Sequence, residues 1–320
     1  MADTYKLAAE ILTINNKNAK SDLNITDLLV GAPLLNTIYA TQSSNGIVDA
    51  YFKLTALPSV GFREINYGLD HTPSGKTLVT NRLRYEDCGH TPIDVAAVRA
   101  TNENLEDLVA EEIKLAIQAG MTRLEWQILN GVYDDGDPLS GFNGLKALVD
   151  ATYVYKANSG SSSGITPTAN KGNSIYLIRS VPDMTGVCSV FNGETSITVG
   201  DTYVGKANGL NNKPFDAYMT PIGAWAGLRI GSKQSVARIC NITDQAGLTA
   251  TDNMVFDAVS KAPAGRPFTH AVMSAKLREQ IRKSRVATNP TGAQVDSPVT
   301  VAGLPIIVTD ALVADLEAIV

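Results

Sequence analysis

Residues 160–164 read Gly-Ser-Ser-Ser-Gly and fit the spacing G-x-S-x-G, in which the central serine can act as a nucleophile. In hydrolases with this motif, the serine stands on a sharp turn between an apolar strand and an apolar helix. Here the motif lies within residues 158–171, a stretch rich in Ser, Gly and Thr that is typical of a flexible linker. A serine hydrolase built on Ser162 therefore stays only a distant alternative.

Two groups of side chains could bind a metal ion. Asp134, Asp135 and Asp137 offer the carboxylate oxygens that Ca²⁺ and Mg²⁺ prefer, but they lack the ligand register of an EF-hand loop. Cys88 and His90 would share one face of a strand, yet no second pair of ligands completes a zinc site with them. We therefore interpret the three aspartates as part of a solvated turn, and Cys88 and His90 as structural residues.

The remaining catalytic patterns are also incomplete. His71 lies near Cys88 in the sequence, and His270 begins a predicted helix, but no motif places a nucleophile beside either of them. Neither a Walker A loop nor a dinucleotide-binding G-x-G-x-x-G occurs. We therefore expect no enzyme activity, no cofactor and no metal site.

The segment over residues 51–92 is predicted to be extended. Its part from 57 to 68 reads Leu-Pro-Ser-Val-Gly-Phe-Arg-Glu-Ile-Asn-Tyr-Gly, and Val60, Phe62 and Ile65 favour a strand. A turn cluster follows at residues 71–76, and strands return at 77–80 and 83–86. Such a two-stranded ribbon is marginally stable alone in water, so it needs a surface to lie on. Nothing in the sequence says that this surface belongs to its own chain.

A long amphipathic helix is predicted over residues 94–130. Apolar residues recur every three or four positions, Asp94 can cap the start, and Asn130-Gly131 can end the helix. Its length would be on the order of 45–50 Å, enough to run along the fold as a spine. A coiled coil is the alternative, which Gly120 and the 3.6-like period disfavour.

Shorter elements follow the long helix. Strands are predicted at 174–179, 196–199, 225–230 and 236–239, and a strand pair at 298–309 surrounds a Gly-Leu-Pro turn. A second helix is predicted at 269–286. It carries an excess of basic residues, which could face phosphate or an acidic neighbour or could simply be solvated. This candidate basic face consists of Lys276, Arg282, Lys283 and Arg285.

Composition places the chain among globular proteins. It has 320 residues, of which 44% are hydrophobic and 18% charged, and its net charge is −5. That charge argues against binding nucleic acid by bulk electrostatics, though not against a local basic face. The cysteines, Cys88, Cys188 and Cys240, are odd in number and widely spaced, which favours buried thiols in a reducing compartment. We see no signal peptide and no apolar run of membrane-spanning length, and expect a soluble protein.

The order of these segments resembles a known family. Residues 57–68 are similar to the start of the extended loop in major capsid proteins of tailed bacteriophages with the Hong Kong ninety-seven type fold. The helix from Asp94 resembles the spine helix of that family. Residues 174–179 and 225–242 resemble strands of its axial domain, residues 273–278 a later helix, and residues 303–306 the closing strand of its peripheral domain. The resemblance covers about residues 25–315.

The resemblance implies an α+β fold with four parts. Residues 1–50 would form an N-terminal arm and residues 51–92 the extended β-ribbon loop. Residues 93–150 and 262–320 would form the peripheral domain with the spine helix. Residues 151–261 would form the axial domain around a central mixed sheet.

The resemblance also implies a structural protein that assembles into an icosahedral shell, a procapsid that matures into a capsid around double-stranded DNA. Implied partners are further copies in hexamers and pentamers, a portal protein, a separate scaffolding protein, packaged DNA bound without sequence specificity, and optionally a decoration protein, with no membrane. The short arm favours the separate scaffold. The shell would be part of the virion and be assembled in the cytoplasm of the bacterial host. An encapsulin-like nanocompartment shell is the alternative.

Four residues of the ribbon are candidates for contacts between subunits. Arg63, Glu64 and Asn66 would contact a neighbour or the ribbon base, or alternatively fix only the local shape of the ribbon. Some members of the family crosslink a Lys to an Asn of a neighbouring subunit, and Lys76, near the predicted turn, is the candidate for that reaction.

Overall fold

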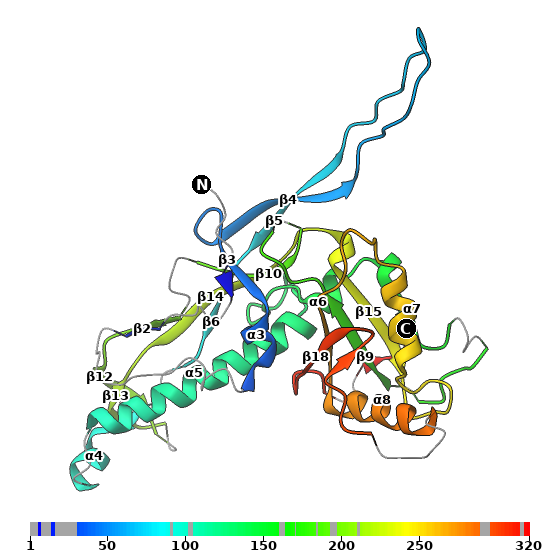
Figure 1. The fold of residues 1–320 in the computed structure, drawn as a ribbon. Helices are drawn as coiled ribbons and strands as arrows, with labels where there is room; N and C mark the ends of the chain where they lie inside the picture. Colours follow the sequence, from blue (N-terminus) through cyan, green and yellow to red (C-terminus); the bar gives the residue numbers. More distant parts are fainter. Residues whose placement is uncertain are drawn as a thin grey trace.

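The computed structural model describes residues 6–7, 14–16, 31–89, 92–101, 105–159, 164–169, 171–183, 185–192, 197–209, 212–288, 295–313 and 317–320. It consists of two large β-sheets with helices packed against them, and a narrow ribbon that projects from the body (Figure 1). Among the described residues, no helix is both long and apolar enough to cross a membrane.

The first large sheet is built around one long buried strand, β14 (Ile222–Ile230). The strand order is β1-β3-β10-β14-β11-β2, and β6 also pairs with β14. The pairs of β14 with its neighbours are antiparallel, whereas β3 runs parallel to β10. A small sheet, β12-β13-β7, extends this half of the molecule. The bounds are β1 (Lys6–Leu7), β2 (Ile14–Asn16), β3 (Tyr39–Gln42), β6 (Arg84–Asp87), β7 (Ile93–Asp94), β10 (Val187–Phe191), β11 (Ile197–Val199), β12 (Tyr203–Asn208) and β13 (Pro214–Met219).

The second large sheet mixes parallel and antiparallel pairs. Its order is β17-β18-β16-β9-β15-β8, with β19 also paired to β9. β16 pairs parallel with β18, and β15 pairs parallel with β8, while β9 is antiparallel to both of its long neighbours. The strands are β8 (Val154–Lys156), β9 (Lys171–Ile178), β15 (Val236–Ile242), β16 (His270–Met273), β17 (Thr300–Val301), β18 (Leu304–Val308) and β19 (Glu317–Ala318); the helices on this side are α7 (Asp252–Ser260) and α8 (Ala275–Thr288).

Sheet pairing groups the chain differently from the expected domain division. β16 and β18, within residues 262–320, pair with β9 rather than joining the sheet beside the long helix. β10 and β14, within residues 151–261, belong to the sheet of β3 and β6. The division into peripheral and axial domains at these boundaries therefore stays a prediction. Because short buried strands carry no signal for which distant strand they will pair with, periodicity alone could not separate the two sheets.

The long helix is confirmed over most of its predicted length. α4 (Val95–Thr101) is followed by α5 (Leu105–Asn130), and the residues between them lie outside the described part. The 26 residues of α5 span about 39 Å. The carboxylate of Asp94 accepts a hydrogen bond from the Ala96 amide at 2.7 Å, as a residue capping the start of a helix does.

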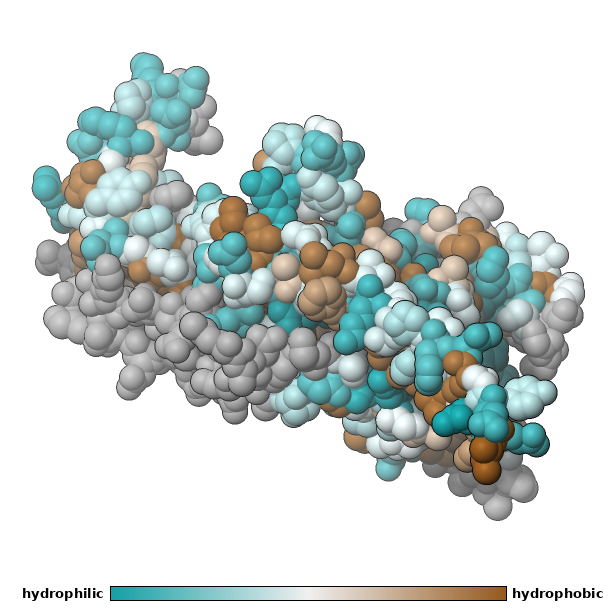
Figure 2. Space-filling model, turned by 90° about the horizontal axis from the view of Figure 1, so that it is seen from above, coloured by the Kyte–Doolittle hydropathy of each residue, from teal (hydrophilic) through white to brown (hydrophobic). Residues whose placement is uncertain are grey.

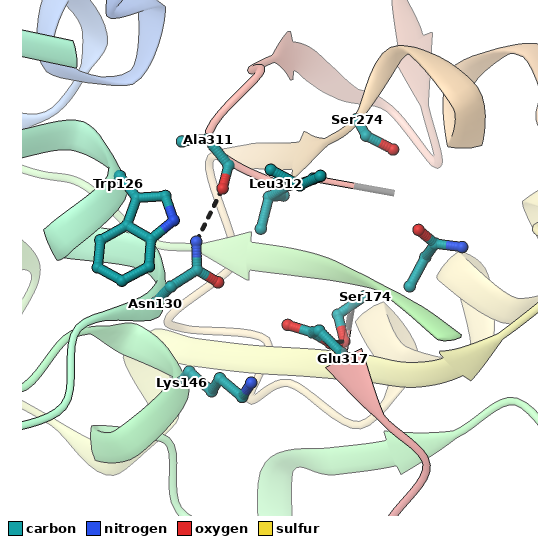
Figure 3. Close-up of a pocket in the computed structure, with 10 residues that line it drawn as sticks. Trp126, Asn130, Lys146, Ser174, Ser274, Ala311, Leu312 and Glu317 are labelled. Carbon is teal, nitrogen blue, oxygen red and sulfur yellow. Dashed lines mark hydrogen bonds between the residues drawn. The ribbon is translucent and has the colours of Figure 1, made fainter. Parts of the chain in front are cut away.

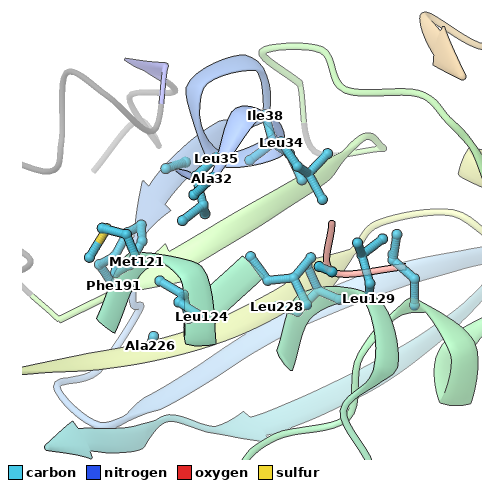
Figure 4. Packing of buried hydrophobic residues seen from close by; sticks show 14 of the residues in the cluster. Ala32, Leu34, Leu35, Ile38, Met121, Leu124, Leu129, Phe191, Ala226 and Leu228 are labelled. Carbon is cyan, nitrogen blue, oxygen red and sulfur yellow. The ribbon is translucent and has the colours of Figure 1, made fainter. Parts of the chain in front are cut away.

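One face of α5 forms the main core of the first half. Ile117, Leu124 and Ile128 recur at helical spacing and are almost fully buried. They pack with apolar side chains of the first sheet and of the short helix α3 (Pro33–Thr37). Figure 4 shows Leu124 of this face among side chains of α3 and the first sheet. Short connecting elements complete this region: α6 (Leu145–Leu148) and the 3-10 turns at Ala151–Tyr153 and Lys233–Ser235.

The ribbon consists of two antiparallel strands, β4 (Val48–Ala56) and β5 (Gly75–Arg82). The predicted strand through Val60 and Ile65 is wrong, because residues 57–74, all of them described, carry no assigned strand. The predicted turn at 71–76 is also misplaced, since the chain reverses at Glu64–Tyr67. There the Tyr67 amide donates to the Glu64 carbonyl at 3.2 Å, and Asn66 has a positive φ of 69°, which Asn tolerates.

The predicted strands at 174–179, 196–199, 225–230 and 236–239 are confirmed as β9, β11, β14 and β15. The strand pair predicted over 298–309 is confirmed as β17 and β18. The turn lies earlier than the predicted Gly-Leu-Pro, at Ala302 and Gly303, both at positive φ, and Leu304 and Pro305 already pair within β18. The second helix begins later than predicted. The apolar run at His270–Met273 forms β16 instead, and the helix starts after Ser274.

Candidate subunit-contact surface

The base of the ribbon is fixed to its own chain by a buried ion pair. Arg229 on β14 donates through Nε and Nη2 to the two carboxylate oxygens of Asp49 on β4, at 2.9 and 2.5 Å. The exposed fractions of the two side chains are 2% and 0%. The Tyr51 hydroxyl accepts from the Ile230 amide at 3.3 Å, and Asn81 of β5 donates to the Leu228 carbonyl at 2.9 Å. Both ribbon strands are thus tied to the first sheet.

The far end of the ribbon, residues 57–74, is exposed, in contrast to the buried base. We call this segment the ribbon tip. Its exposed fractions reach 89% for Val60, 107% for Phe62 and 90% for Ile65, and Leu57 and Tyr67 are also exposed. Scattered apolar residues are normal on a protein surface, and Figure 2 shows separate apolar patches among hydrophilic residues on one face. A run of large apolar side chains on a projecting hairpin is different, and such a run is typical of interaction sites.

The candidate contact residues lie at two places on the ribbon. The Arg63 guanidinium donates to the Tyr67 carbonyl at 3.2 Å across the turn, which also contains Glu64 and Asn66. The side chains of all three are exposed. Lys76 is not at the tip: it lies on β5 opposite Leu54, beside the register shift between Leu54 and Ala56. The turn geometry supports a local role for Arg63 and leaves its remaining donors free to face solvent.

The basic residues of α8 are largely engaged within the chain. Lys276 contacts Asp244 at 2.7 Å, Arg282 contacts Glu279 at 2.7 Å, and Arg285 contacts Asp252 at 2.6 Å. The Lys276 ammonium lowers the pKa of Asp244, mainly through its hydrogen bond. Lys283 is exposed. These acidic partners compensate most of the local charge that the sequence suggested, and the interpretation as a solvated face gains support.

A groove lies between β6 and α5. It has a volume of about 790 Å³ and is lined by strand residues from Arg82 to Cys88, by helix residues such as Ala116, Ala119, Gly120 and Arg123, and by the loop from Pro138 to Phe142. At its floor a Cβ on Gly120 would lie 2.5 Å from the Cys88 Sγ, so only glycine permits this close approach. We call it the β6–α5 groove. No sequence pattern predicts this groove, because tertiary structure brings its two walls together.

Glu86 is the unusual group in this groove. Among the described residues, its Oε2 is buried and has no hydrogen-bond partner. Burial raises the pKa of Glu86 to about 7, and the positive charge of Arg123 opposes that shift in part. Burial likewise raises the pKa of the Cys88 thiol to about 12, so it is not a reactive thiolate at neutral pH.

A second buried carboxylate, Glu125 on α5, joins the two halves of the molecule. It accepts hydrogen bonds from the Leu34 and Leu35 amides of α3 at 2.8 and 3.4 Å, and from the Thr309 hydroxyl just after β18. Burial, its largest influence, raises the pKa of Glu125 although these donors lower it. The residue was missed because its partners lie far away in the sequence.

A cavity of about 220 Å³ lies where the end of α5, β9 and the start of α8 meet (Figure 3). Asn130 donates across it to the Ala311 carbonyl at 2.8 Å. Glu317 on β19 is paired with Arg238 at 2.8 Å and also accepts from the Ser174 hydroxyl. Because the carboxylate is already engaged with these partners, we interpret the network as a tie between β19, β9 and β15.

The other candidate groups do not form a catalytic or metal site in the described part of the chain. Asp134 and Asp137 accept from the amides of Gly136 and Leu139, each at 2.9 Å, which is the geometry of a polar turn. His71 lies on the ribbon tip, whereas Cys88 faces α5; His90 and Ser162 fall outside the described residues. No cluster of three or more His, Cys, Asp or Glu side chains suited to a metal occurs among the described residues.

Comparison with known proteins supplies the family. A family model described as major capsid protein GP7 matches residues 18–320. Among curated proteins, no match to the chain is found. A chain in the structure of bacteriophage Epsilon15 is similar, with a TM-score of 0.59 and 16% identity over 87% of this chain and 86% of that chain. At this identity the likeness shows the fold, and it confirms the expected α+β capsid fold.

Two further solved structures are similar only at TM-scores below 0.5. A chain of the bacteriophage JBD30 capsid, decorated with minor capsid protein trimers, matches with a TM-score of 0.47 and 12% identity over 85% of this chain and 88% of that chain. A chain of the SrpI encapsulin complex from Synechococcus elongatus matches with a TM-score of 0.41 and 12% identity, over 73% and 94% of the two chains. The family match, which spans nearly the whole chain, decides: the chain belongs to the major capsid protein GP7 family and is a structural component of a phage capsid rather than an enzyme.

Proposed function

We propose that copies of this chain form the hexamers and pentamers of an icosahedral shell, and that each ribbon tip lies on an adjacent subunit. The supporting observation is the exposed apolar run at Val60, Phe62 and Ile65 on a ribbon whose base is held by the buried pair of Asp49 and Arg229. Burying one such side chain stabilises a contact by about 1.5–3 kcal/mol. Because every subunit makes the contact, modest individual energies suffice for a shell.

Replacing the outer part of the tip tests this proposal. The Ser59 amide donates to the Thr72 carbonyl at 3.1 Å, so the two strands can be closed there by Asn-Gly in place of residues 60–71. We expect a subunit with unchanged thermal unfolding that no longer forms shells, as seen by electron microscopy and sedimentation. The matched control replaces residues 210–211, in the connection between β12 and β13, by Asn-Gly. Normal shells from the shortened ribbon would overturn the proposal.

The other partners follow from the same assembly. We propose a separate scaffolding protein that directs assembly of a procapsid, a portal protein at one vertex, and packaged double-stranded DNA that is enclosed without sequence-specific contacts, all in the cytoplasm of a bacterial host. The net charge of −5 and the ion pairs of α8 leave little positive charge for phosphates. They support a shell that encloses the DNA over one that binds it tightly. We also propose a decoration protein as an optional partner of the assembled shell.

Lys76 remains our candidate for a covalent crosslink between subunits. Its side chain is exposed at the start of β5. If the crosslink forms, matured shells dissolved in denaturant will migrate as ladders on a gel, and Lys76→Arg will abolish those ladders. If matured shells of the unaltered protein give only monomer bands on the gel, the proposed crosslink is contradicted.

A further inference from the structure

The β6–α5 groove contains an acceptor that its own subunit leaves unused. The buried Oε2 of Glu86 has no partner among the described residues. An unsatisfied buried polar group is costly, and native structures normally provide a donor for it. Two of the three arginines that line the groove contact aromatic rings: the Arg84 guanidinium lies 4.6 Å from the Tyr133 ring centre, and that of Arg123 lies 4.3 Å from the Trp126 ring centre. The third, Arg82, is exposed.

The rim of the groove is apolar and open. Leu139, at one side, is 89% exposed, and the exposed Leu115 and Ala119 continue the surface along α5. A ligand that fits this site therefore combines a hydrogen-bond-donating cation, for the carboxylate of Glu86, with large apolar groups for the rim.

The ribbon tip carries this combination. Arg63 stands between Phe62 and Ile65, both almost completely exposed. Among the described residues its guanidinium makes one hydrogen bond, to the Tyr67 carbonyl, which uses a single N–H of five. Glu64, the next residue, offers an opposite charge for Arg84 and Arg123 of the groove. Figure 1 shows the ribbon projecting away from α5, so the tip that reaches a groove belongs to another copy.

We propose that the β6–α5 groove receives the ribbon tip of a second copy of this chain, with the Arg63 guanidinium donating to the Glu86 carboxylate and Phe62 and Ile65 covering the apolar rim. The inference rests on the proposed function and adds the receiving site and the recognising pair. A guanidinium pairs with a carboxylate through two parallel hydrogen bonds, which fixes the orientation as well as the partner.

A disulfide trap tests the placement within assembled shells. Glu64→Cys, which leaves Arg63 in place, and Ala119→Cys are combined in a chain with Cys88→Ala, and shells are oxidised and analysed on non-reducing gels. We expect crosslinked dimers and higher species. In the matched control, the second cysteine is Lys114→Cys, exposed on the same helix but outside the groove, and no crosslink is expected. If shells form but crosslink equally well at positions 119 and 114, or at neither position, the ribbon tip does not lie in the groove. That result would leave the proposed shell function unaffected.

A charge exchange tests the pair itself. Arg63→Glu or Glu86→Lys alone should weaken the contact on the order of 30-fold, seen as a raised critical concentration for assembly. The double variant should recover most of that loss. Because Glu86→Lys could impair folding, Glu86→Gln serves as the conservative variant, and its thermal unfolding is compared first. Recovery supports the pair, whereas equal assembly of Arg63→Glu and the unaltered chain would contradict it.

Discussion

At the base of the ribbon Asp49 is fully buried against Arg229, whereas at its tip Phe62 and Ile65 are almost wholly exposed. The two ends of one hairpin therefore have different tasks. The base makes a desolvated ion pair that is costly to break, which ties it to the stability of the subunit. The tip makes few contacts with its own chain and is available to another. The difference separates substitutions that unfold the subunit from those that prevent its assembly.

The largest expected effect is at the base. Asp49→Ala removes the buried carboxylate that pairs with the Arg229 guanidinium, and we expect the free energy of unfolding to fall by about 3–5 kcal/mol. Denaturant unfolding of the unassembled subunit measures this. The control is Lys206→Ala, which breaks an exposed ion pair with Asp216 and should cost less than about 1 kcal/mol. Equal losses for the two variants would show that burial of the base is unimportant.

The next largest effect is the pH dependence of subunit stability that arises from Glu86 in the β6–α5 groove. The pKa of Glu86 is about 7 in the folded subunit, against 4.5 for an ordinary glutamate. Between these values the folded state holds a proton that the unfolded chain releases, so stability falls as pH rises from about 4.5 to about 7, by up to about 3 kcal/mol. Glu86→Gln should remove this part of the pH dependence from unfolding curves of the free subunit. A Glu86→Gln curve parallel to that of the unaltered chain would contradict the burial of the carboxyl group.

At the tip, the effect should appear in assembly alone. Phe62→Ser removes a side chain that contacts little in the free subunit, so we expect its unfolding free energy to change by less than about 0.5 kcal/mol. Each subunit contact should weaken by about 1.5–3 kcal/mol, measured from the concentration dependence of shell formation by light scattering. A destabilised subunit with normal shells would reverse the assignment of tasks to base and tip.

The smallest effect separates two roles of Asn66. Its positive φ costs an ordinary residue about 1–2 kcal/mol, so Asn66→Ala should loosen the turn and speed hydrogen exchange of the Tyr67 amide. Asn66→Gly keeps the backbone shape without the amide side chain. We expect shells from Asn66→Gly to form normally, which would assign the residue to local geometry. Failed assembly would instead assign it to the contact between subunits.

Much of the fold was predictable from local sequence patterns. The apolar spacing of α5 and the cap at Asp94 depend on neighbours within a few residues, and both were predictable. The reversal at Glu64–Tyr67 was missed because Val60, Phe62 and Ile65 resemble a buried strand. Their apolar character fits a partner surface that the isolated chain does not supply.

The contact surface was less predictable because it depends on residues far apart in the sequence. The partners Asp49 and Arg229 are 180 positions apart, and no spacing rule connects them. The same holds for Arg285 with Asp252, which turned an apparent basic face into an internal ion pair. Glu86 became notable only once β6 was placed beside α5.

Labelling of a single cysteine at the tip tests the central claim most directly. In a Phe62→Cys chain, the rate of reaction with a maleimide is compared between the free subunit and the assembled shell, with Thr80→Cys on the exposed side of β5 as reference. If each tip lies on a neighbour, Cys at position 62 will react rapidly in the free subunit and at least about tenfold more slowly in the shell, an opening cost of about 1.4 kcal/mol. Equal rates at position 62 in the subunit and in the shell would contradict the account.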